Sequence, residues 1–154
     1  MEIVNTLPFP LVATTFFFLG LAIGSFANVC IYRLPKKESI IFPKSHCPAC
    51  SVAVRPLDNI PVLSFLILEG KCRECKNSIS AIYPTVEVFT GLLFLAGYFK
   101  FGLSFDFLVH LVVAPTLVII TAIDIEHQII PDVITIPGII FGLTAGSYSI
   151  GYFN

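Results

Sequence analysis

A run of 24 residues without a charged side chain, from Pro8 to Ile31, limits what this chain can fold into. A helix of about 20 apolar residues is long enough to cross a hydrocarbon core about 30 Å thick. No Lys or Arg precedes the run and no small-residue cleavage site follows it, which argues against a cleaved signal peptide. The run is therefore predicted to be a retained transmembrane helix.

Three further apolar runs follow a polar segment, at about 83–100, 105–123 and 132–152. In the first of these, Pro84 stands where a first-turn proline loses no helix hydrogen bond. The polar segment contains five prolines and has no sustained helical period, so it is predicted to be irregular, with short strands and turns. We expect a first transmembrane helix in 1–32, a polar module in 33–82, and the second to fourth transmembrane helices in 83–154.

Composition supports this organisation. Hydrophobic residues make up 56% of the chain and charged residues only 12%, against about 25% charged residues in an ordinary soluble domain. The net charge of −1 gives no support for a nucleic-acid partner. The predicted fold class is an all-α polytopic membrane protein with about four transmembrane helices, whose partner is the lipid bilayer.

The basic residues are gathered in one part of the chain. Eight of the nine Lys and Arg residues lie between Arg33 and Lys76. Because loops rich in Lys and Arg stay in the cytoplasm, the 33–82 module is predicted to be cytoplasmic and the N-terminus to lie outside. The turn that follows Ile123 then returns to the same face as the module.

Four of the five cysteines form two Cys-x-x-Cys pairs, CPAC and CREC, made by Cys47, Cys50, Cys72 and Cys75. Four cysteines can make two disulfides or one metal site. A reducing cytoplasm disfavours disulfides, and the 21 residues between the pairs suit tetrahedral zinc. With four thiolates and no open position, such a site is structural.

A few polar or small residues interrupt the apolar runs. Gly20, Gly24 and Asn28 recur every four residues, a pattern typical of close helix packing with an amide available for a hydrogen bond. His110 is interpreted as a hydrogen-bonding residue of the bundle rather than a ligand. Glu87 can serve either as a partner of the helix dipole or as an inward-facing polar residue.

Two aspartates lie near the end of the third run. Asp124 follows the apolar sequence VIITAI directly, where hydrocarbon meets water. An acid at such a position is either half of an acid/base pair or a marker of the helix boundary. Asp132 follows Pro131, where it is expected to cap a helix. Glu126 and His127 are interpreted as solvated turn residues.

Taken in order, four motifs resemble one family, the bacterial type IV prepilin peptidases. GSFANVCIYRLP at 24–35 is similar to the first-helix signature of the family. The segment from SHCPAC to GKCREC at 45–75 resembles its zinc module. ISAIYPTVEVFTGLLF at 79–94 resembles the entry to its second helix, and IDIEHQIIPDVITIP at 123–137 the segment with its first catalytic aspartate.

This resemblance implies an intramembrane aspartic protease of the bacterial inner membrane. Such enzymes cleave prepilins and pseudopilins after the glycine that ends a short basic leader, at the cytoplasmic face. They then methylate the new N-terminus with S-adenosylmethionine. By the same matching, Asp124 takes the place of the first catalytic aspartate, and Cys47, Cys50, Cys72 and Cys75 take the places of the zinc ligands. Gly70 and Lys71 match a pair linked to methyl transfer.

The sequence departs from the family pattern at two places. Ile82 stands where the family usually has Arg, and the Gly-x-Gly-Asp motif of the second catalytic aspartate does not occur in these 154 residues. We therefore expect the N-terminal part of a prepilin peptidase, with half of the catalytic pair. The alternative is a non-catalytic, membrane-anchored zinc module that scaffolds pilus or type II secretion components.

Overall fold

Four long helices dominate the computed structural model, which describes residues 9–153, with side chains described to residue 148. They are α1 (Phe9–Arg33), α3 (Ile82–Phe101), α4 (Phe105–His127) and α5 (Asp132–Phe153). Two short helices, η2 (Pro56–Asn59) and α2 (Leu63–Ile67), lie between α1 and α3. Within the described residues, the only β-structure is a pair of isolated bridges. The all-helical prediction is confirmed.

Three of these helices, α1, α3 and α4, are long and apolar enough to cross a membrane. In α5 the apolar stretch with described side chains, Asp132–Tyr148, is shorter. The chain is thus a multi-pass membrane protein with three candidate spans and a further apolar helix. We call α1, α3 and α4 the helix bundle, and residues 34–81, which separate α1 from α3, the cysteine module.

Glycines bring α1 and α3 into close contact. A Cβ atom added at Gly20 would lie 2.7 Å from Cα of Gly91, and one added at Gly24 would lie 2.7 Å from Cα of Glu87. The Asn28 side chain is buried and donates a hydrogen bond to the carbonyl of Tyr83 at 3.0 Å. The predicted packing role of this four-residue repeat is confirmed.

Helix α4 completes the bundle. The His110 ring nitrogen Nε2 lies 2.9 Å from the carbonyl oxygen of Leu93 on α3, to which it donates. Gly97 leaves the space for that ring, because a Cβ there would overlap it. The rings of Phe16 and Phe107 meet edge to face at 4.7 Å, which joins α1 to α4. The prediction that His110 is a hydrogen-bonding residue of the bundle is confirmed.

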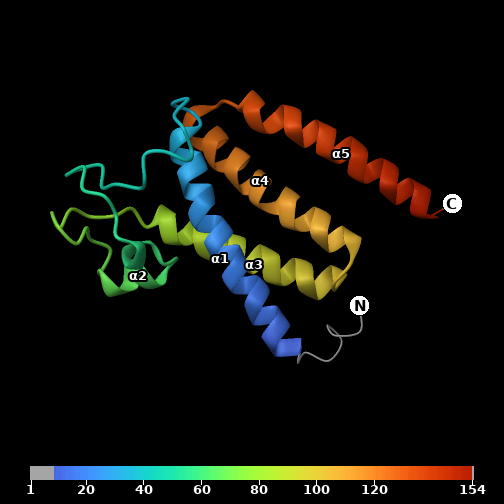
Figure 1. The fold of residues 1–154 in the computed structure, drawn as a ribbon, viewed down its shortest axis with the longest axis horizontal. Coiled ribbons are helices and arrows are strands. Elements are labelled where there is room, and N and C mark those ends of the chain that lie inside the picture. Colours follow the sequence, from blue (N-terminus) through green and yellow to red (C-terminus); the bar gives the residue numbers. More distant parts are fainter. Residues whose placement is uncertain (1–8, 154) are drawn as a thin grey trace.

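Helix α5 stands apart from the bundle along most of its length (Figure 1). Near its far end the Tyr148 ring lies 4.5 Å from that of Phe105, at the start of α4. A Cβ added at Gly138, Gly142 or Gly146 would meet no atom within 4 Å. The described face of α5 that carries these glycines is therefore open.

One end of the molecule gathers the cysteine module and four helix ends. The end of α1, the start of α3, the end of α4 and the start of α5 all lie on this side (Figure 1). Arg33, the last residue of α1, is buried and donates to the carbonyls of Ser39 at 2.8 Å and Pro43 at 2.7 Å. These bonds fold the first loop of the module back onto the helix.

Candidate functional site

The first Cys-x-x-Cys pair forms a compact turn. The backbone N–H of Ser51 donates to the carbonyl of Cys47 at 2.8 Å, and the N–H of Cys47 donates to the carbonyl of Val52 at 2.9 Å. Ser51 adopts a positive φ of 60°, which reverses the chain after Cys50. An isolated bridge between His46 and Ala53 closes the turn.

The second pair repeats this geometry. The N–H of Lys76 donates to the carbonyl of Cys72 at 3.0 Å, and the N–H of Cys72 donates to the carbonyl of Asn77 at 2.8 Å. Lys76 has a φ of 58°, the counterpart of the positive φ in the first turn. Two equivalent turns therefore present their cysteines to each other.

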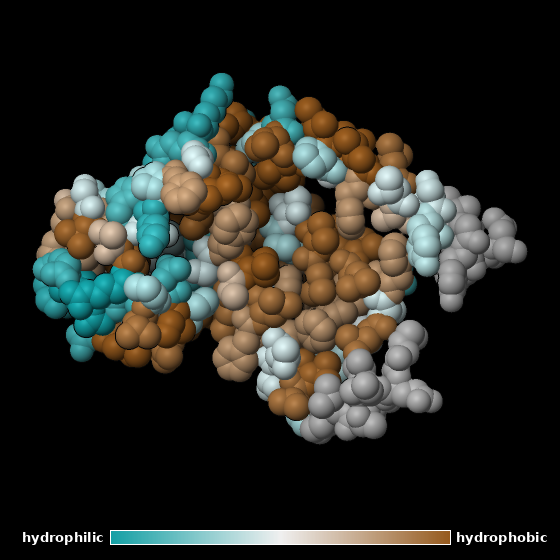
Figure 2. Space-filling view, in the orientation of Figure 1, coloured by the Kyte–Doolittle hydropathy of each residue, from teal (hydrophilic) through white to brown (hydrophobic). Residues whose placement is uncertain are grey.

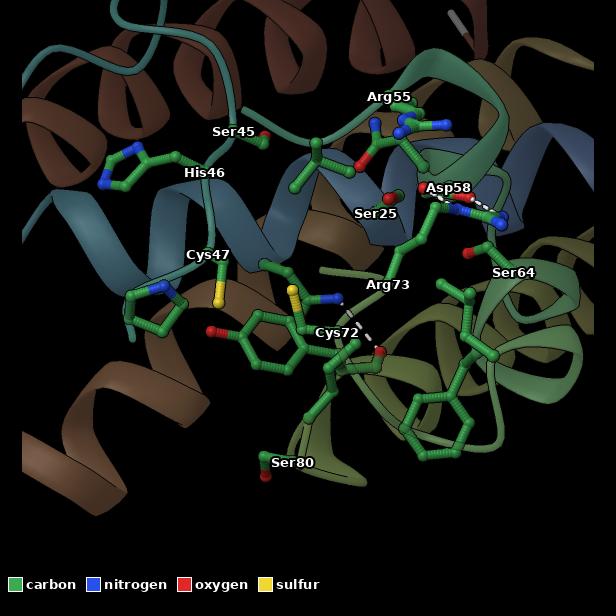
Figure 3. A pocket seen from close by; sticks show the side chains of 18 of the residues that line it. Ser25, Ser45, His46, Cys47, Arg55, Asp58, Ser64, Cys72, Arg73 and Ser80 are labelled. Atoms are coloured by element: carbon green, nitrogen blue, oxygen red, sulfur yellow. Dashed lines mark hydrogen bonds and ion pairs between the residues drawn. The ribbon is translucent and has the colours of Figure 1, made fainter. Parts of the chain in front are cut away.

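The four cysteine sulfurs lie within 4.8 Å of one another. The Sγ atoms of Cys47 and Cys75, one from each turn, are 3.8 Å apart, within hydrogen-bonding distance, and do not form a disulfide. Two sulfurs at about 2.3 Å from one tetrahedral zinc ion are separated by about 3.8 Å. The cluster therefore fits a metal with four thiolate ligands, and Figure 3 shows two of these cysteines, Cys47 and Cys72, in the lining of a pocket.

The thiols differ in acidity. Backbone N–H groups of Cys50 and Ala49 lower the pKa of the Cys47 thiol to about 6. Cys50 receives a similar bond from the N–H of Val52, but burial and the shared neighbours Cys75 and Cys47 raise its pKa to about 11. A thiolate is thus favoured at Cys47 and disfavoured at Cys50.

Two ion pairs attach the second turn to η2. Arg73 donates to both carboxylate oxygens of Asp58, at 2.8 and 2.6 Å, and this guanidinium lowers the pKa of Asp58. The neighbouring Glu74 accepts from Arg55 at 2.8 Å. Both residues between Cys72 and Cys75 therefore hold the segment around η2 in place.

A cavity of about 440 Å³ separates the cysteine module from the ends of α1 and α3. Ser25 and Asn28 line it from α1, Tyr83 and Glu87 from α3, and Arg73 from the module. Figure 3 shows Ser25 and Arg73 in this lining. The lining combines charges of both signs with aromatic rings. It can accommodate a ligand that carries both charges and an apolar part.

Gly70 and Lys71 lie at the rim of this region and do not line the cavity. Gly70 has a φ of 65°, and a Cβ there would lie 3.0 Å from the ring of Phe65, which does line the cavity. The Lys71 side chain is exposed and its backbone bridges to Ser78. The positive φ of Gly70 therefore favours glycine at this position.

Asp124 lies in the last turn of α4, which continues to His127 before Gln128 ends it in the left-handed conformation. Its side chain is exposed, directly after the fully buried Ile123. Glu126 and His127 are exposed too, but they belong to the helix and not to the turn expected there.

Asp124 thus lies at the end of the bundle that carries the cysteine module (Figure 1), and it does not line the cavity. Asp132 begins α5, where its carboxylate is placed to interact with the helix dipole.

Three structural roles were not predicted from the sequence. Arg33 was counted only among the basic residues, yet its side chain is buried and organises a loop. Asp58 was not singled out, although it anchors the second cysteine turn. Glu87 was left ambiguous and accepts a hydrogen bond from the backbone N–H of Val62 at 2.7 Å. The buried position of Glu87 in an apolar helix was the one available signal.

Comparison with known proteins assigns this sequence to a family. The family model described as "Bacterial Peptidase A24 N-terminal domain" matches residues 18–101, more than half of the chain. The chain belongs to this family. The matched A24 domain includes most of α1, the whole cysteine module and α3.

Curated relatives are named "Prepilin leader peptidase/N-methyltransferase". The protein from Myxococcus xanthus is 44% identical over 87% of this chain and 40% of its own length. The one from Aeromonas hydrophila is 35% identical over 98% of this chain and 61% of its own length. The one from Bacillus subtilis is 40% identical over 78% of this chain and 48% of its own length. The chain thus spans about half the length of these relatives. No solved structure matches it.

Proposed function

We propose that this chain acts in the cleavage of prepilins and pseudopilins, with Asp124 as one of two catalytic carboxylates. Membership of the peptidase A24 family carries the proposal. The place of Asp124 supports it, because an exposed carboxylate at the end of a candidate span is accessible to water at the membrane boundary. The substrates would be proteins with a short basic leader that ends in glycine, met at the cytoplasmic face of the inner membrane.

Peptide hydrolysis by a pair of aspartates divides the proton transfers between them. An ionised carboxylate removes a proton from the attacking water, while the protonated partner donates one, finally to the leaving amine. One carboxylate cannot hold both states at once. Asp124 therefore requires a second carboxylate, and these 154 residues contain no Gly-x-Gly-Asp motif to supply it.

The four-cysteine cluster would hold one structural Zn²⁺ ion through Cys47, Cys50, Cys72 and Cys75. The fit of the sulfur separations supports this assignment. When bound, the ion would supply folding free energy to the module and take no part in hydrolysis. The proposal also includes the predicted orientation, with the module in the cytoplasm and the N-terminus outside.

Methylation of the new N-terminus with S-adenosylmethionine is the second proposed activity. The name of the relatives includes an N-methyltransferase. Of the two residues linked to methyl transfer, Lys71 gives the cleaner test, because Lys71→Ala changes only an exposed side chain. We expect cleaved but unmethylated pilin in this variant, detected by mass spectrometry of the pilin N-terminus. Fully methylated pilin would contradict a role for Lys71.

The test of the peptidase proposal is Asp124→Asn, made in cells that produce the protein from its native gene. The substitution keeps the size of the side chain and removes its acid/base function, so we expect uncleaved prepilin to accumulate on immunoblots. Glu126→Gln is the matched control, because Glu126 is exposed in the same helical turn. Normal cleavage with Asp124→Asn would contradict the peptidase proposal and favour a scaffolding role for the module.

A further inference from the structure

A ten-residue stretch of the cysteine module, Asn59 to Leu68, contains no charged residue. It includes α2, and three of its large apolar side chains are exposed: Leu63 at 51%, Leu66 at 65% and Ile67 at 66%. Uncharged stretches of this length are typical of buried helices or of segments that lie in a membrane interface. Its exposed side chains exclude the first alternative within the described part of the chain.

This segment lies beside the middle of α1. Ile60, Val62 and Leu66 face Phe18 and Leu21 across an apolar groove of about 310 Å³. Phe18 is 15 residues from the end of α1 at Arg33, which is about 22 Å along the helix. Since α1 is a candidate membrane span, the segment is level with part of the chain that crosses the hydrocarbon.

The colouring of the surface agrees with this placement. Figure 2 shows hydrophobic atoms on the lower edge of the module, where Figure 1 places α2, below a largely hydrophilic surface. The hydrophobic atoms of the helix bundle lie beside them in the same view. The exposed fraction of Phe18, 64%, shows that the neighbouring face of α1 is itself uncovered.

The buried carboxylate of Glu87 holds the segment beside the first turns of α3. Glu87 accepts a hydrogen bond from the N–H of Val62, where the backbone has a positive φ of 60° just before α2. Glu87 is five residues into α3, about 7.5 Å below its start. Ser64 donates its hydroxyl to the carbonyl of Ile60 at 2.7 Å. Away from water, backbone groups need such partners.

We propose that the Asn59–Leu68 segment is inserted into the bilayer among the lipid acyl chains, on the side of the cysteine module. Leu63, Leu66 and Ile67 contact lipid acyl chains there, and Glu87 positions the segment. Lipid is the occupant because the exposed surface continues that of the membrane-spanning α1. The segment also carries no charge that would pair with a basic or acidic peptide. The inference does not depend on catalysis by Asp124.

Fluorescence quenching tests the insertion. The chain has no Trp, so Leu66→Trp introduces a single reporter, and Val52→Trp in the first cysteine turn is a matched control with an exposed fraction of 46%. The whole chain is placed in lipid vesicles containing lipid brominated near the top of the acyl chain. We expect the brominated lipid to quench Leu66→Trp and aqueous acrylamide to leave it largely unquenched, because an inserted apolar side chain lies among the acyl chains. Val52→Trp should behave in the opposite way.

Two results overturn the lipid contact. If acrylamide quenches Leu66→Trp as strongly as Val52→Trp, the segment faces water. If neither quencher reaches Leu66→Trp, a second copy of the chain or another protein covers it.

A second pair of variants tests the positioning role of Glu87. In the Leu66→Trp background, Glu87→Gln keeps an oxygen that can accept from Val62 N–H, whereas Glu87→Leu removes it. We expect quenching by the brominated lipid to persist with Glu87→Gln and to fall with Glu87→Leu, while the zinc content of both stays unchanged. Equal quenching in the two variants would overturn the positioning role.

Discussion

The helix bundle and the cysteine module are adjacent but are held together by different forces. In the bundle, backbones meet at glycines, and side chains such as Phe94, Phe107 and Ile123 are fully buried. In the described structure, no residue of 34–81 is buried to the same degree. The module is ordered by turns, two ion pairs and a cluster of thiols. The bundle is thus stabilised by close packing, whereas the module depends on turns, ion pairs and a four-cysteine cluster that fits a metal ion.

The largest expected effect comes from replacing one of the four clustered cysteines. Cys72→Ser leaves three thiolates, and the binding free energy of a structural zinc site is about 10–16 kcal/mol. We expect the variant to lose its zinc and the module to become sensitive to protease, while the helical circular dichroism of the bundle persists. Zinc analysis and limited proteolysis measure both. Cys30→Ser, at a buried position of α1, is the control that should keep its zinc. A zinc-free but protease-resistant module would contradict the comparison.

The reverse experiment disrupts the bundle and spares the module. In Gly24→Leu the new side chain overlaps the backbone at Glu87, so we expect a loss of about 1–3 kcal/mol of stability with zinc content unchanged. Thermal unfolding in detergent measures the loss. Gly142→Leu is matched to it, because a Cβ at Gly142 meets nothing within 4 Å. Similar losses of stability in the two variants would show that the close helix contact at Gly24 matters no more than the open position at Gly142.

A smaller effect is expected from the hydrogen bond that joins α1 to the start of α3. Asn28→Ala removes the donor to the Tyr83 carbonyl, and such bonds between membrane helices contribute about 0.6 kcal/mol on average. Denaturation in mixed micelles compares the variant with the wild type. A loss as large as that of Gly24→Leu would mean that polar contacts, and not close packing, dominate this interface.

The smallest effect concerns the ion pair between Asp58 and Arg73. Because Arg73 lowers the pKa of Asp58, the pair stabilises the folded module above the usual carboxyl pKa, near 4. The contribution is lost as the pH falls through the lowered pKa of the folded state. Asp58→Asn should therefore be less stable than wild type at neutral pH, and the difference should vanish in acid. The comparison is made at pH values where both proteins keep their zinc, because release of the metal would unfold the module and remove the difference by itself.

The sequence predicted the bundle well because its signals are local. Apolar length, the placement of Pro84 and the repeat of Gly20, Gly24 and Asn28 each restrict a helix without reference to distant residues. The cysteine cluster was predictable for a similar reason, since each turn needs only its own Cys-x-x-Cys pair. The end of α4 was placed too early, because its polar last turn remains helical to His127.

Apart from the cysteine cluster, contacts between segments far apart in the chain could not be predicted. The partner of Glu87 is Val62, 25 residues away, and no periodic pattern relates the two. The same is true of Asp58 and Arg73, whose pairing depends on how η2 lies against the second cysteine turn. For Asp124, the sequence indicated a membrane boundary, and its catalytic role stays a prediction.

The hydrogen bonds of Arg33 connect the end of α1 to the loop that follows it. Its guanidinium has no carboxylate partner in the described structure and is held by two loop carbonyls, while Lys36 lies 3.2 Å from the centre of the Tyr32 ring. The last turn of α1 and the loop that follows it are therefore held together by these contacts. A displacement of this loop would therefore act first on the end of α1, the helix that carries the close contacts of Gly20 and Gly24 with α3.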